Sequence, residues 1–389
     1  MKVAIVTETF LPATDGIVTR LLYAIDALVA QGNEVLIVCP DMGEEVHVEG
    51  ATVVTTPSKT FAFYPSRPWG LPSSKVTDAL EDFGPEIIHT VSPTSLCLTA
   101  TKYAEDNGIP LISSYHTRMI QYFDHYWYFK PFKGIIWSYL RALLNAAPRT
   151  LVTSGAMQKE LTAAGVVGVD VLPRGLDQEK RHPKHASAEM RARLTEGEVD
   201  KPLLVYIGRL AIEKDIESLL AVVKANPDYR YAIIGDGPIK KELEEIFADT
   251  PTIFTGFLHG DEVSQAFATA DVFLFPSRSE TLGLVILEAM ASGTPIISVR
   301  SEPIEEQIDN GINGIIYDTE EELLAAVHTL LNDKELYETI RRNGLESASS
   351  QSWENASQAL IDFYVETIEL YESVNFDQKK IKEMIKNRT

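Results

Sequence analysis

The stretch Leu203-Leu204-Val205-Tyr206-Ile207-Gly208-Arg209 decides the fold class, and the rest of the sequence repeats its pattern. An apolar run without polar alternation, ended by a glycine, is typical of a strand that is covered on both faces of a parallel sheet. Similar runs recur between segments of helical periodicity, namely Val3 to Val6, Val35 to Val38, Ile87 to His89, Leu111 to Ser114, Thr150 to Thr153, Tyr231 to Ile234, Thr252 to Thr255, Val272 to Phe275 and Pro295 to Val299. Strands that alternate with helices predict an α/β fold with parallel sheets.

The apolar runs form two sets, because the polar stretch from Arg174 to Asp200 separates them. A chain of 389 residues is long enough for two domains. We therefore expect two Rossmann-like, doubly wound domains, over residues 1–175 and 176–352, that face each other across a cleft. Ligands of such sheets bind at the carboxyl ends of the strands, so the cleft is the expected site.

The segment after Trp353 has helical periodicity but no following strand. Its apolar residues are Ala356, Leu360, Phe363, Tyr364, Ile368 and Tyr371. We expect a helix over residues 353–375 that returns to the first domain. The basic tail over residues 376–389 is expected to be frayed and solvated, with a basic helix on a membrane surface as the alternative.

The composition excludes several classes of protein. With 35 Lys and Arg against 56 Asp and Glu, the formal net charge is −21, which repels a phosphate backbone and argues against general nucleic-acid binding. Cys39 and Cys97 lie in apolar runs and are expected to be buried rather than disulfide-bonded, as fits a reducing cytoplasm. No apolar run is long enough to span a bilayer, and the first residues are typical of a strand rather than of a signal peptide.

Candidate binding residues follow the predicted strands. In the first domain, Gly16 opens a helix after the loop that begins at Thr9, and backbone amides at a helix start attract an anion. In the second domain, Arg209 and Lys214 follow the strand that ends at Ile207, where two cations suit a diphosphate. Each feature alone also has an ordinary explanation, as a turn glycine or as solvated surface cations.

Two more segments follow strands of the second domain. The turn Gly235-Asp236-Gly237-Pro238 permits close approach of a ligand, but it is equally an ordinary turn before a helix. The segment from Phe275 to Pro295 places Glu280 in a loop and Glu288 after an apolar run that predicts a buried helix. Because a buried carboxylate needs hydrogen-bond partners, both glutamates are candidates to bind sugar hydroxyls.

Taken in order, these motifs resemble the retaining nucleotide-sugar glycosyltransferases of family 4, which have the GT-B fold. The shared features are Gly208-Arg209 with Lys214, the Gly235 to Pro238 turn, and the pair Glu280 and Glu288 followed by Ala289-Met290-Ala291-Ser292-Gly293-Thr294-Pro295. The resemblance extends to about Tyr371. It implies a hexosyltransferase that uses a nucleotide sugar as co-substrate, with no cofactor and no metal ion, and the chain contains no Asp-x-Asp pair.

The resemblance also implies a role for each motif residue. Arg209 and Lys214 would hold the donor diphosphate, which the loop at Gly16 would approach, and Glu288 would bind the ribose. Glu280 and the amides after it would hold the donor sugar. The donor-binding set further contains Gly235, Phe257, Leu258, Thr281, Leu282 and Gly283, with the backbone of Phe257 and Leu258 near the base.

His116 follows the strand that ends at Ser114, and it matches the family's active-site histidine beside the sugar. The catalytic set that the resemblance implies is His116, Arg209, Lys214 and Glu280. The expected mechanism is front-face attack, in which the leaving diphosphate helps to take the acceptor proton, so no general base is assigned. Asp15 is a candidate contact of an acceptor hydroxyl.

The loop at Glu280 departs from the commonest family pattern, because Glu280-Thr281-Leu282-Gly283 stands where Glu-Gly-Phe-Gly is usual. The identity of the donor therefore stays open. Within the family, the chain is similar to the sulfoquinovosyldiacylglycerol synthases and to the related GDP-mannose-dependent mannosyltransferases. The segments that carry this similarity are Thr7 to Pro12, Asp15 to Arg20, Ser114 to Thr117 and Pro276 to Val285.

A local basic and aromatic segment favours a lipid acceptor. No acidic residue occurs from His125 to Lys159, and the cations there are Lys130, Lys133, Arg141, Arg149 and Lys159. The aromatic residues just before or within it are Tyr122, Phe123, Tyr126, Trp127, Tyr128, Phe129, Phe132, Trp137 and Tyr139. Aromatic residues mixed with cations suit the surface of an anionic membrane, although they equally suit a domain core. Tyr115, Tyr122 and Tyr126 are candidate acceptor contacts.

We therefore expect a cytoplasmic, peripheral enzyme on the inner face of a membrane. It would transfer a sugar from UDP-sulfoquinovose or another UDP-hexose to a glycerolipid such as diacylglycerol. A GDP-mannose-dependent α-mannosyltransferase that acts on a lipid or a soluble glycan is the alternative. A catalytically inactive sugar-nucleotide binding module and a non-hydrolysing epimerase are further alternatives on the same fold. The sequence does not determine the oligomeric state.

Overall fold

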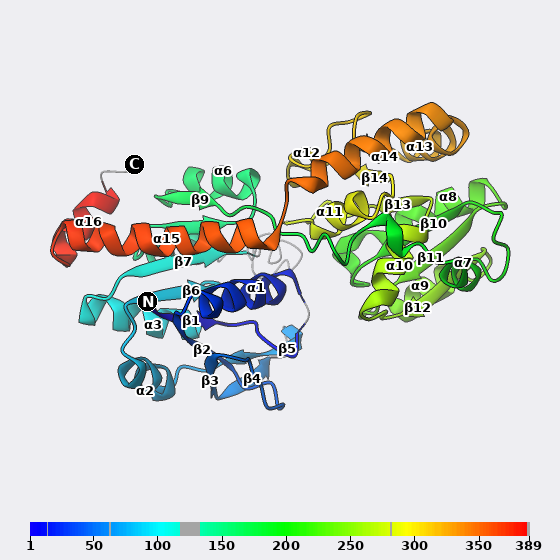
Figure 1. Cartoon of the computed structure of the whole chain (residues 1–389). Coiled ribbons are helices and arrows are strands. Elements are labelled where there is room, and N and C mark those ends of the chain that lie inside the picture. Colours follow the sequence, from blue (N-terminus) through cyan, green and yellow to red (C-terminus); the bar gives the residue numbers. More distant parts are fainter. Residues whose placement is uncertain (14, 62–63, 117–132, 281, 387–389) are drawn as a thin grey trace. The chain divides into compact units, whose positions relative to one another are not determined.

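The computed structural model describes residues 1–13, 15–61, 64–116, 133–280 and 282–386 of the chain (Figure 1). The chain divides into two compact units. Unit 1 consists of Met1–Gly175 together with Trp353–Thr389, and unit 2 consists of Leu176–Ser352. Each unit has its own parallel sheet and its own hydrophobic core.

The sheet of unit 1 has seven parallel strands in the order β3-β2-β1-β6-β7-β8-β9. These strands are β1 (Lys2–Thr7), β2 (Glu34–Pro40), β3 (Ala51–Thr56), β6 (Ile87–Val91), β7 (Leu111–Tyr115), β8 (Thr150–Val152) and β9 (Val169–Val171). A separate antiparallel pair follows β3 and consists of β4 (Ser58–Phe61) and β5 (Tyr64–Gly70). The described helices of the unit are α1 (Gly16–Ala30), α2 (Ser74–Phe83), α3 (Ser95–Asn107), α5 (Lys133–Leu144), α6 (Gly155–Ala163), α15 (Trp353–Ser373) and α16 (Gln378–Lys386).

The sheet of unit 2 has six parallel strands in the order β12-β11-β10-β13-β14-β15. These are β10 (Leu203–Ile207), β11 (Arg230–Ile234), β12 (Thr252–Gly256), β13 (Val272–Phe275), β14 (Ile296–Val299) and β15 (Ile315–Tyr317). The α-helices are α7 (Ala188–Leu194), α8 (Leu220–Ala225), α9 (Lys240–Ile246), α10 (Asp261–Thr269), α11 (Leu284–Ala291), α12 (Glu302–Glu305), α13 (Glu320–Asn332) and α14 (Lys334–Ser349). Short 3₁₀ helices are η2 (Pro183–His185), η3 (Ile212–Lys214) and η4 (Ile216–Leu219).

Both sheets reverse their direction of winding beside their first strand. β1 lies between β2 and β6, and β10 lies between β11 and β13. This is the strand order of doubly wound nucleotide-binding sheets, in which ligands bind beyond the carboxyl ends of the strands at the reversal. The predicted α/β class with two Rossmann-like sheets is confirmed, and the cleft between them stays a prediction.

Every strand predicted from an apolar run is present. The sequence did not reveal β3, β9 and β15, which are edge strands, or the β4 and β5 pair. β9 and β15 are only three residues long. An edge strand is covered less completely than a central one, so it does not need the continuous apolar run by which the others were found. Cys39 and Cys97 are buried free thiols, as expected, and burial raises the pKa of each to about 12.

Helix α15 returns to unit 1, as expected, and packs along α1 (Figure 1). Leu360, Ile361 and Tyr364 belong to the core of this unit. At the start of α15, the ring of Trp353 stacks on Tyr23 of α1 with a centroid distance of 4.8 Å. The core of unit 1 is therefore built from both ends of the chain.

The expectation of a frayed tail was wrong. Helix α16 continues the chain after α15. Ile381 and Ile385 are 2% and 5% exposed and cluster with Val167 and Tyr371. Protein covers the apolar face of α16, and this burial offsets the conformational entropy that ordering the tail removes.

Candidate active site

Two of the predicted donor-binding residues form an ion pair at the winding reversal of unit 2. Lys214 ends η3, after the loop that follows β10, and Glu280 lies in the loop after β13. Lys214 Nζ lies 2.8 Å from Glu280 Oε2, and the two side chains are only 17% and 19% exposed. The ammonium also lies 5.9 Å from the centre of the Phe275 ring. The pair places a cation that suits phosphate beside a carboxylate that can accept hydrogen bonds from sugar hydroxyls.

Arg209 lies on the same loop as Lys214 and is more exposed. Its side chain is 54% exposed and forms an ion pair with Glu213. The loop itself is fixed, because Ser279 donates its hydroxyl to the carbonyl of Glu213 at 2.9 Å, and Tyr206 donates to the carbonyl of Arg209 at 3.1 Å. An exposed ion pair contributes little to stability, so the guanidinium can turn toward an anion at small cost.

Gly235 has a packing requirement that the sequence did not reveal. A Cβ atom at Gly235 would lie 1.9 Å from the carbonyl oxygen of Gly208, and one at Gly237 would lie 2.1 Å from that of Leu210. The amide of Leu210 also donates to the carbonyl of Asp236 at 2.9 Å. The glycines therefore let the backbones after β10 and β11 touch, which supports the loop that carries the two cations. Contact of Gly235 with a donor stays a prediction.

Glu288 lies in α11, which begins after Gly283, whose φ of 63° suits a glycine. Glu288 Oε1 accepts a hydrogen bond of 3.1 Å from Arg181 Nε and forms an ion pair with Nη2 at 2.9 Å. Arg181 Nη1 also donates to Ser264 Oγ at 3.0 Å. Glu288 Oε2 has no hydrogen-bond partner in the described part of the chain. One carboxylate oxygen is thus anchored, and the other can accept from a pair of hydroxyls such as those of a ribose.

Sequence reasoning missed Arg181. It lies 107 positions before Glu288, in the polar stretch that separates the two sets of apolar runs, and no motif surrounds it. The stretch contains a cation beside the short helix η2, but charge alone does not distinguish a site residue from a surface residue.

The other residues that were predicted to bind the donor differ in their burial and contacts. Phe257 is 60% exposed, whereas Leu258 is 7% exposed and belongs to the core of unit 2. The carbonyl of Leu282 accepts a hydrogen bond of 3.2 Å from Gln307 Nε2, which fixes the approach to α11. Thr281 lies outside the described residues. The contacts of these residues with a base or a sugar stay predictions.

In unit 1, a buried chain of hydrogen bonds leads to His116. Its Nε2 lies 2.9 Å from Ser114 Oγ, which lies 2.9 Å from Nε2 of His89. His89 Nδ1 lies 2.8 Å from the hydroxyl of Tyr364. Burial lowers the pKa of His89 to about 3, and burial with the nearby Arg20 and His89 lowers the pKa of His116 well below its usual value. Both imidazoles are therefore neutral at neutral pH.

The directions of the hydrogen bonds from Tyr364 to His116 determine the tautomers of the two histidines. The buried hydroxyl of Tyr364 has His89 as its partner in the described structure, so we assign it as the donor to Nδ1. His89 then carries its hydrogen on Nε2 and donates to Ser114, which in turn donates to Nε2 of His116. His116 consequently carries its hydrogen on Nδ1. This leaves a neutral histidine with one fixed N–H donor, which suits a contact with a substrate oxygen.

The start of α1 is as predicted, but its amides are partly used. Gly16 is the first residue of α1. The carboxylate of Asp15 caps the helix, because Oδ1 accepts from the amides of Ile17 at 2.9 Å and Val18 at 3.1 Å. Asp15 thus occupies amides that a phosphate was expected to meet, and its contact with an acceptor stays a prediction.

The predicted acceptor contacts and the aromatic segment are described only in part. Tyr122 and Tyr126 lie outside the described residues. Tyr115 is 1% exposed and packs in the core of unit 1, which does not favour contact with an acceptor. In α5, Trp137 packs against the same cluster, whereas Ile135 is 68% exposed. The described part of the segment therefore contributes both to the core and to the surface.

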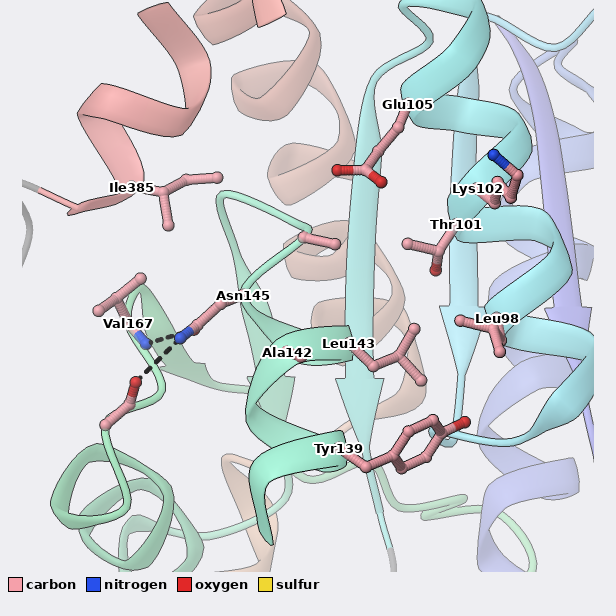
Figure 2. A pocket seen from close by; sticks show the side chains of 12 residues that line it. Leu98, Thr101, Lys102, Glu105, Tyr139, Ala142, Leu143, Asn145, Val167 and Ile385 are labelled. Atoms are coloured by element: carbon pink, nitrogen blue, oxygen red, sulfur yellow. Dashed lines mark hydrogen bonds between the residues drawn. The ribbon is translucent and has the colours of Figure 1, made fainter. Parts of the chain in front are cut away.

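Unit 1 contains a cavity of about 660 Å³ that is lined by residues of α3, α5 and α16 (Figure 2). Its lining is mainly apolar and includes Leu98, Tyr139, Leu143, Val167 and Ile385. Leu98 and Tyr139 are 48% and 39% exposed. The volume lies in the range of small-molecule sites, roughly 300–1,000 Å³. No predicted donor residue lines this cavity.

Two further observations concern the described ranges only. Within them, no group of three or more His, Cys, Asp or Glu side chains is arranged to hold a metal ion. No helix among the described elements is long and apolar enough to cross a membrane. Transfer without a metal ion stays a prediction.

Comparison with known proteins gives the family. A family model described as Glycosyl transferases group 1 matches residues 190–347, and one described as Glycosyltransferase Family 4 matches residues 14–180. A GDP-mannose-dependent alpha-mannosyltransferase of Corynebacterium glutamicum is 32% identical over 96% of this chain and 91% of its own length. The chain belongs to the family 4 glycosyltransferases. The family that the motifs predicted is confirmed, and the protein is a glycosyltransferase.

Other relatives of this glycosyltransferase carry the names of different enzymes. Sulfoquinovosyl transferase SQD2 of Arabidopsis thaliana is 38% identical over 84% of this chain, and the chain spans 66% of that relative's length. An alpha-monoglucosyldiacylglycerol synthase of Streptococcus pneumoniae is 27% identical over 95% of this chain and 86% of its own. The solved structure of a sucrose-phosphate synthase from Thermosynechococcus elongatus aligns with a TM-score of 0.79 at 19% identity, over 95% of this chain and 99% of that one. This likeness shows the shared GT-B fold.

Proposed function

We propose that this glycosyltransferase moves a hexosyl group, with retention of configuration, from a nucleotide sugar to a membrane glycerolipid. UDP-sulfoquinovose is the first candidate donor. The observation that carries the proposal is the set of charged groups at the winding reversal of unit 2, where Lys214 pairs with Glu280 and Arg181 anchors Glu288. The similarity to the Arabidopsis sulfoquinovosyl transferase supports the choice of donor.

The donor residues act through charge and hydrogen bonding. Lys214 and Arg209 neutralise the diphosphate and stabilise its departure, which lowers the barrier to breaking the glycosidic bond. Glu280 then accepts hydrogen bonds from hydroxyls of the sugar, and the open oxygen of Glu288 accepts from the ribose. Because two cations already face the diphosphate, the proposed reaction needs no metal ion.

In unit 1, His116 supplies the Nδ1–H donor to an oxygen of the donor sugar. Its depressed pKa keeps it neutral, so it positions the sugar and does not serve as an acid. The leaving diphosphate takes the proton of the acceptor hydroxyl as the new bond forms on the same face of the sugar. The anomeric configuration is retained in consequence.

The proposed acceptor is a glycerolipid such as diacylglycerol. One relative carries diacylglycerol in its name. The exposed apolar side chains Leu98, Ile135 and Tyr139 of unit 1 support a peripheral contact with a membrane surface, and Leu98 and Tyr139 also line the apolar cavity. Arg141 on α5 adds positive charge that suits anionic lipid.

The test is release of UDP from UDP-sulfoquinovose in the presence and absence of diacylglycerol liposomes. Release that requires the liposomes would support the proposal. Glu288→Gln should lower kcat/KM by about tenfold to a hundredfold, because it weakens charge-assisted hydrogen bonds at the site. Glu244→Gln, an exposed change on α9, is the control and should keep wild-type activity. Undiminished transfer by Glu288→Gln would contradict the site assignment.

The same assay decides between the proposal and its alternatives. Turnover of GDP-mannose alone would establish the mannosyltransferase, which the Corynebacterium relative supports. Consumption of donor without any acceptor would favour an epimerase. Binding of donors without turnover under any of these conditions would favour the inactive binding module.

A further inference from the structure

Arg20 is a buried cation to which the proposed function gives no role. It lies in the second turn of α1 and is 3% exposed. Its Nε, Nη1 and Nη2 atoms are buried, and none has a hydrogen-bond partner among the described residues. Arg20 also ends the Asp15 to Arg20 motif that carries part of the family resemblance.

A buried guanidinium without partners is rare in proteins. The group has five N–H donors and keeps its charge at any physiological pH. Buried arginines are almost always paired, because an unpaired charge in a medium of low dielectric constant is strongly unfavourable. The ring of Trp353, whose centre lies 5.8 Å from Arg20 Cζ, offers a cation–π contact but accepts no conventional hydrogen bond. Within the described structure, no hydrogen-bond acceptor therefore uses the donors of Arg20.

A neighbouring cation acts on Arg20. Burial and the neighbouring Arg174 lower the pKa of Arg20 to about 10. Arg20 in turn contributes to the lowered pKa of His116, so the two side chains are close enough for their charges to interact. His116 brings a second donor, its Nδ1–H. Several donors in a positive potential are the pattern of an anion-binding site.

We propose that Arg20, Arg174 and His116 form an oxyanion subsite in unit 1, which takes a sulfonate or phosphate group of a substrate. The oxygens of a tetrahedral anion match the fork of guanidinium N–H donors. α1 follows β1 and His116 follows β7, so the subsite lies at the carboxyl edge of the sheet, where substrates bind. Its existence does not depend on the donor, but its assignment to the sulfonate of a sulfo-sugar rests on the proposed function.

Thermal unfolding of the full chain tests the subsite without any donor. Arg20→Met keeps an unbranched side chain and removes the charge and the N–H donors. Millimolar inorganic phosphate or methanesulfonate should raise the unfolding temperature of the wild type by roughly 2–5 °C and that of Arg20→Met by much less. The ligand-free variant should be at least as stable as the wild type, because an unpaired buried charge is gone. The exposed variant Arg342→Met also loses one guanidinium, so it is the control for the general effect of salt on the unfolding temperature.

Three outcomes would overturn the subsite. In the first, Arg20→Met unfolds at a lower temperature and responds to both anions as the wild type does, which would make the guanidinium structural. In the second, all three proteins respond equally, as a general salt effect requires. In the third, the wild type does not respond. If Arg20→Met does not fold, Arg20→Lys replaces it and should weaken the response, because lysine keeps the charge but loses the fork of donors.

Equilibrium binding measurements with three ligands then show which substrate group occupies the subsite. UDP-sulfoquinovose and UDP-glucose differ at C6, where the first carries a sulfonate and the second a hydroxyl. If Arg20→Met weakens binding of UDP-sulfoquinovose alone, by roughly tenfold, the subsite holds the donor sulfonate. An equal loss for both sugars and for UDP assigns it to the diphosphate. Unchanged binding of all three, with the phosphate response lost, assigns it to the phosphate of a phosphate-bearing acceptor lipid, which diacylglycerol is not.

The two proposals can fail separately. Binding of GDP-mannose with no binding of the UDP ligands would overturn the proposed donor. The response to phosphate and methanesulfonate would still decide whether the subsite exists, because it uses neither nucleotide.

Discussion

At the scale of single residues, the hydrogen bonds from Tyr364 through His89 and Ser114 to His116 are the most informative feature of unit 1. Each member gives or receives the hydrogen that its neighbour needs, and all of them are buried. Because an unpaired polar group in the interior is costly, the loss of one member would disturb the others. A side chain of α15 thereby helps to position the candidate catalytic histidine.

Acid should destabilise unit 1 through His89. Its pKa is about 3 in the folded protein and 6.5 for a free imidazole, so the unfolded chain takes the proton first as the pH falls. The contribution of His89 to the free energy of unfolding is therefore full above pH 6.5 and falls by about 1.4 kcal/mol per pH unit below it. In urea unfolding, His89→Gln should reduce the loss between pH 6.5 and pH 5.0 by about 2 kcal/mol.

The control for this prediction is His328→Gln, which changes an exposed imidazole on α13. It should keep the wild-type dependence of unfolding on pH. An acid dependence that His89→Gln leaves unaltered would mean that the folded protein already binds a proton at His89, and the tautomers assigned to the chain would then be wrong.

At the scale of elements, α16 shows how one amphipathic pattern can be interpreted in two ways. An apolar stripe beside lysines suits either a membrane surface or a protein surface. In the structure, Ile381 and Ile385 lie against Val167 and Tyr371, so the stripe is covered within unit 1. The same residues are then unavailable to lipid while the helix is docked.

Truncation of Ile381 tests this docking. Ile381→Ala leaves a cavity beside Val167 and Tyr371, so it should lower the free energy of unfolding in urea by about 2 kcal/mol. Lys380→Ala, an exposed change on the same helix, should alter it by less than about 0.5 kcal/mol. Unchanged stability of Ile381→Ala, together with weaker sedimentation on anionic vesicles, would instead place the apolar face of α16 in the lipid.

At the scale of the whole molecule, the two units are built differently from the chain. Unit 2 is continuous in sequence, and its core draws on residues between Leu176 and Ala348. Unit 1 needs both ends of the chain, because α15 contributes Leu360, Ile361 and Tyr364 to its core. Unit 2 can therefore fold independently as one segment, whereas unit 1 can do so only with α15 present.

Two truncated chains should behave oppositely. The fragment 176–352 should fold alone, with a cooperative urea transition and dispersed amide signals in NMR spectra. A chain that ends at residue 352 should show only the transition of unit 2, because the core of unit 1 is left open. A second cooperative transition in the longer chain would show that the core of unit 1 is complete without α15.

The order of strands and loops could be predicted from the sequence because its causes are local. A strand that is covered on both faces must be apolar along its length, and parallel strands bring their loops to one edge. The loops at Gly208-Arg209 and at Glu280 were each predicted as binding loops, and Lys214 and Glu280 do form an ion pair. The family motifs were recognised for the same reason, since each is a short, contiguous stretch.

The pairings that complete the candidate site were decided by the tertiary structure. Arg181 lies 107 positions from Glu288, and His89 lies 275 positions from Tyr364. Such contacts depend on which face of a helix packs on which strand, and many different residues can satisfy the same periodicity. The orphaned guanidinium of Arg20 was invisible for a similar reason, since burial without a partner is a property of three-dimensional packing. The sequence by itself determined the fold class, the family and the loops that carry the chemistry, because those rest on local patterns. Only the folded chain decided which charges are anchored, which histidine is positioned and where an anion can be held.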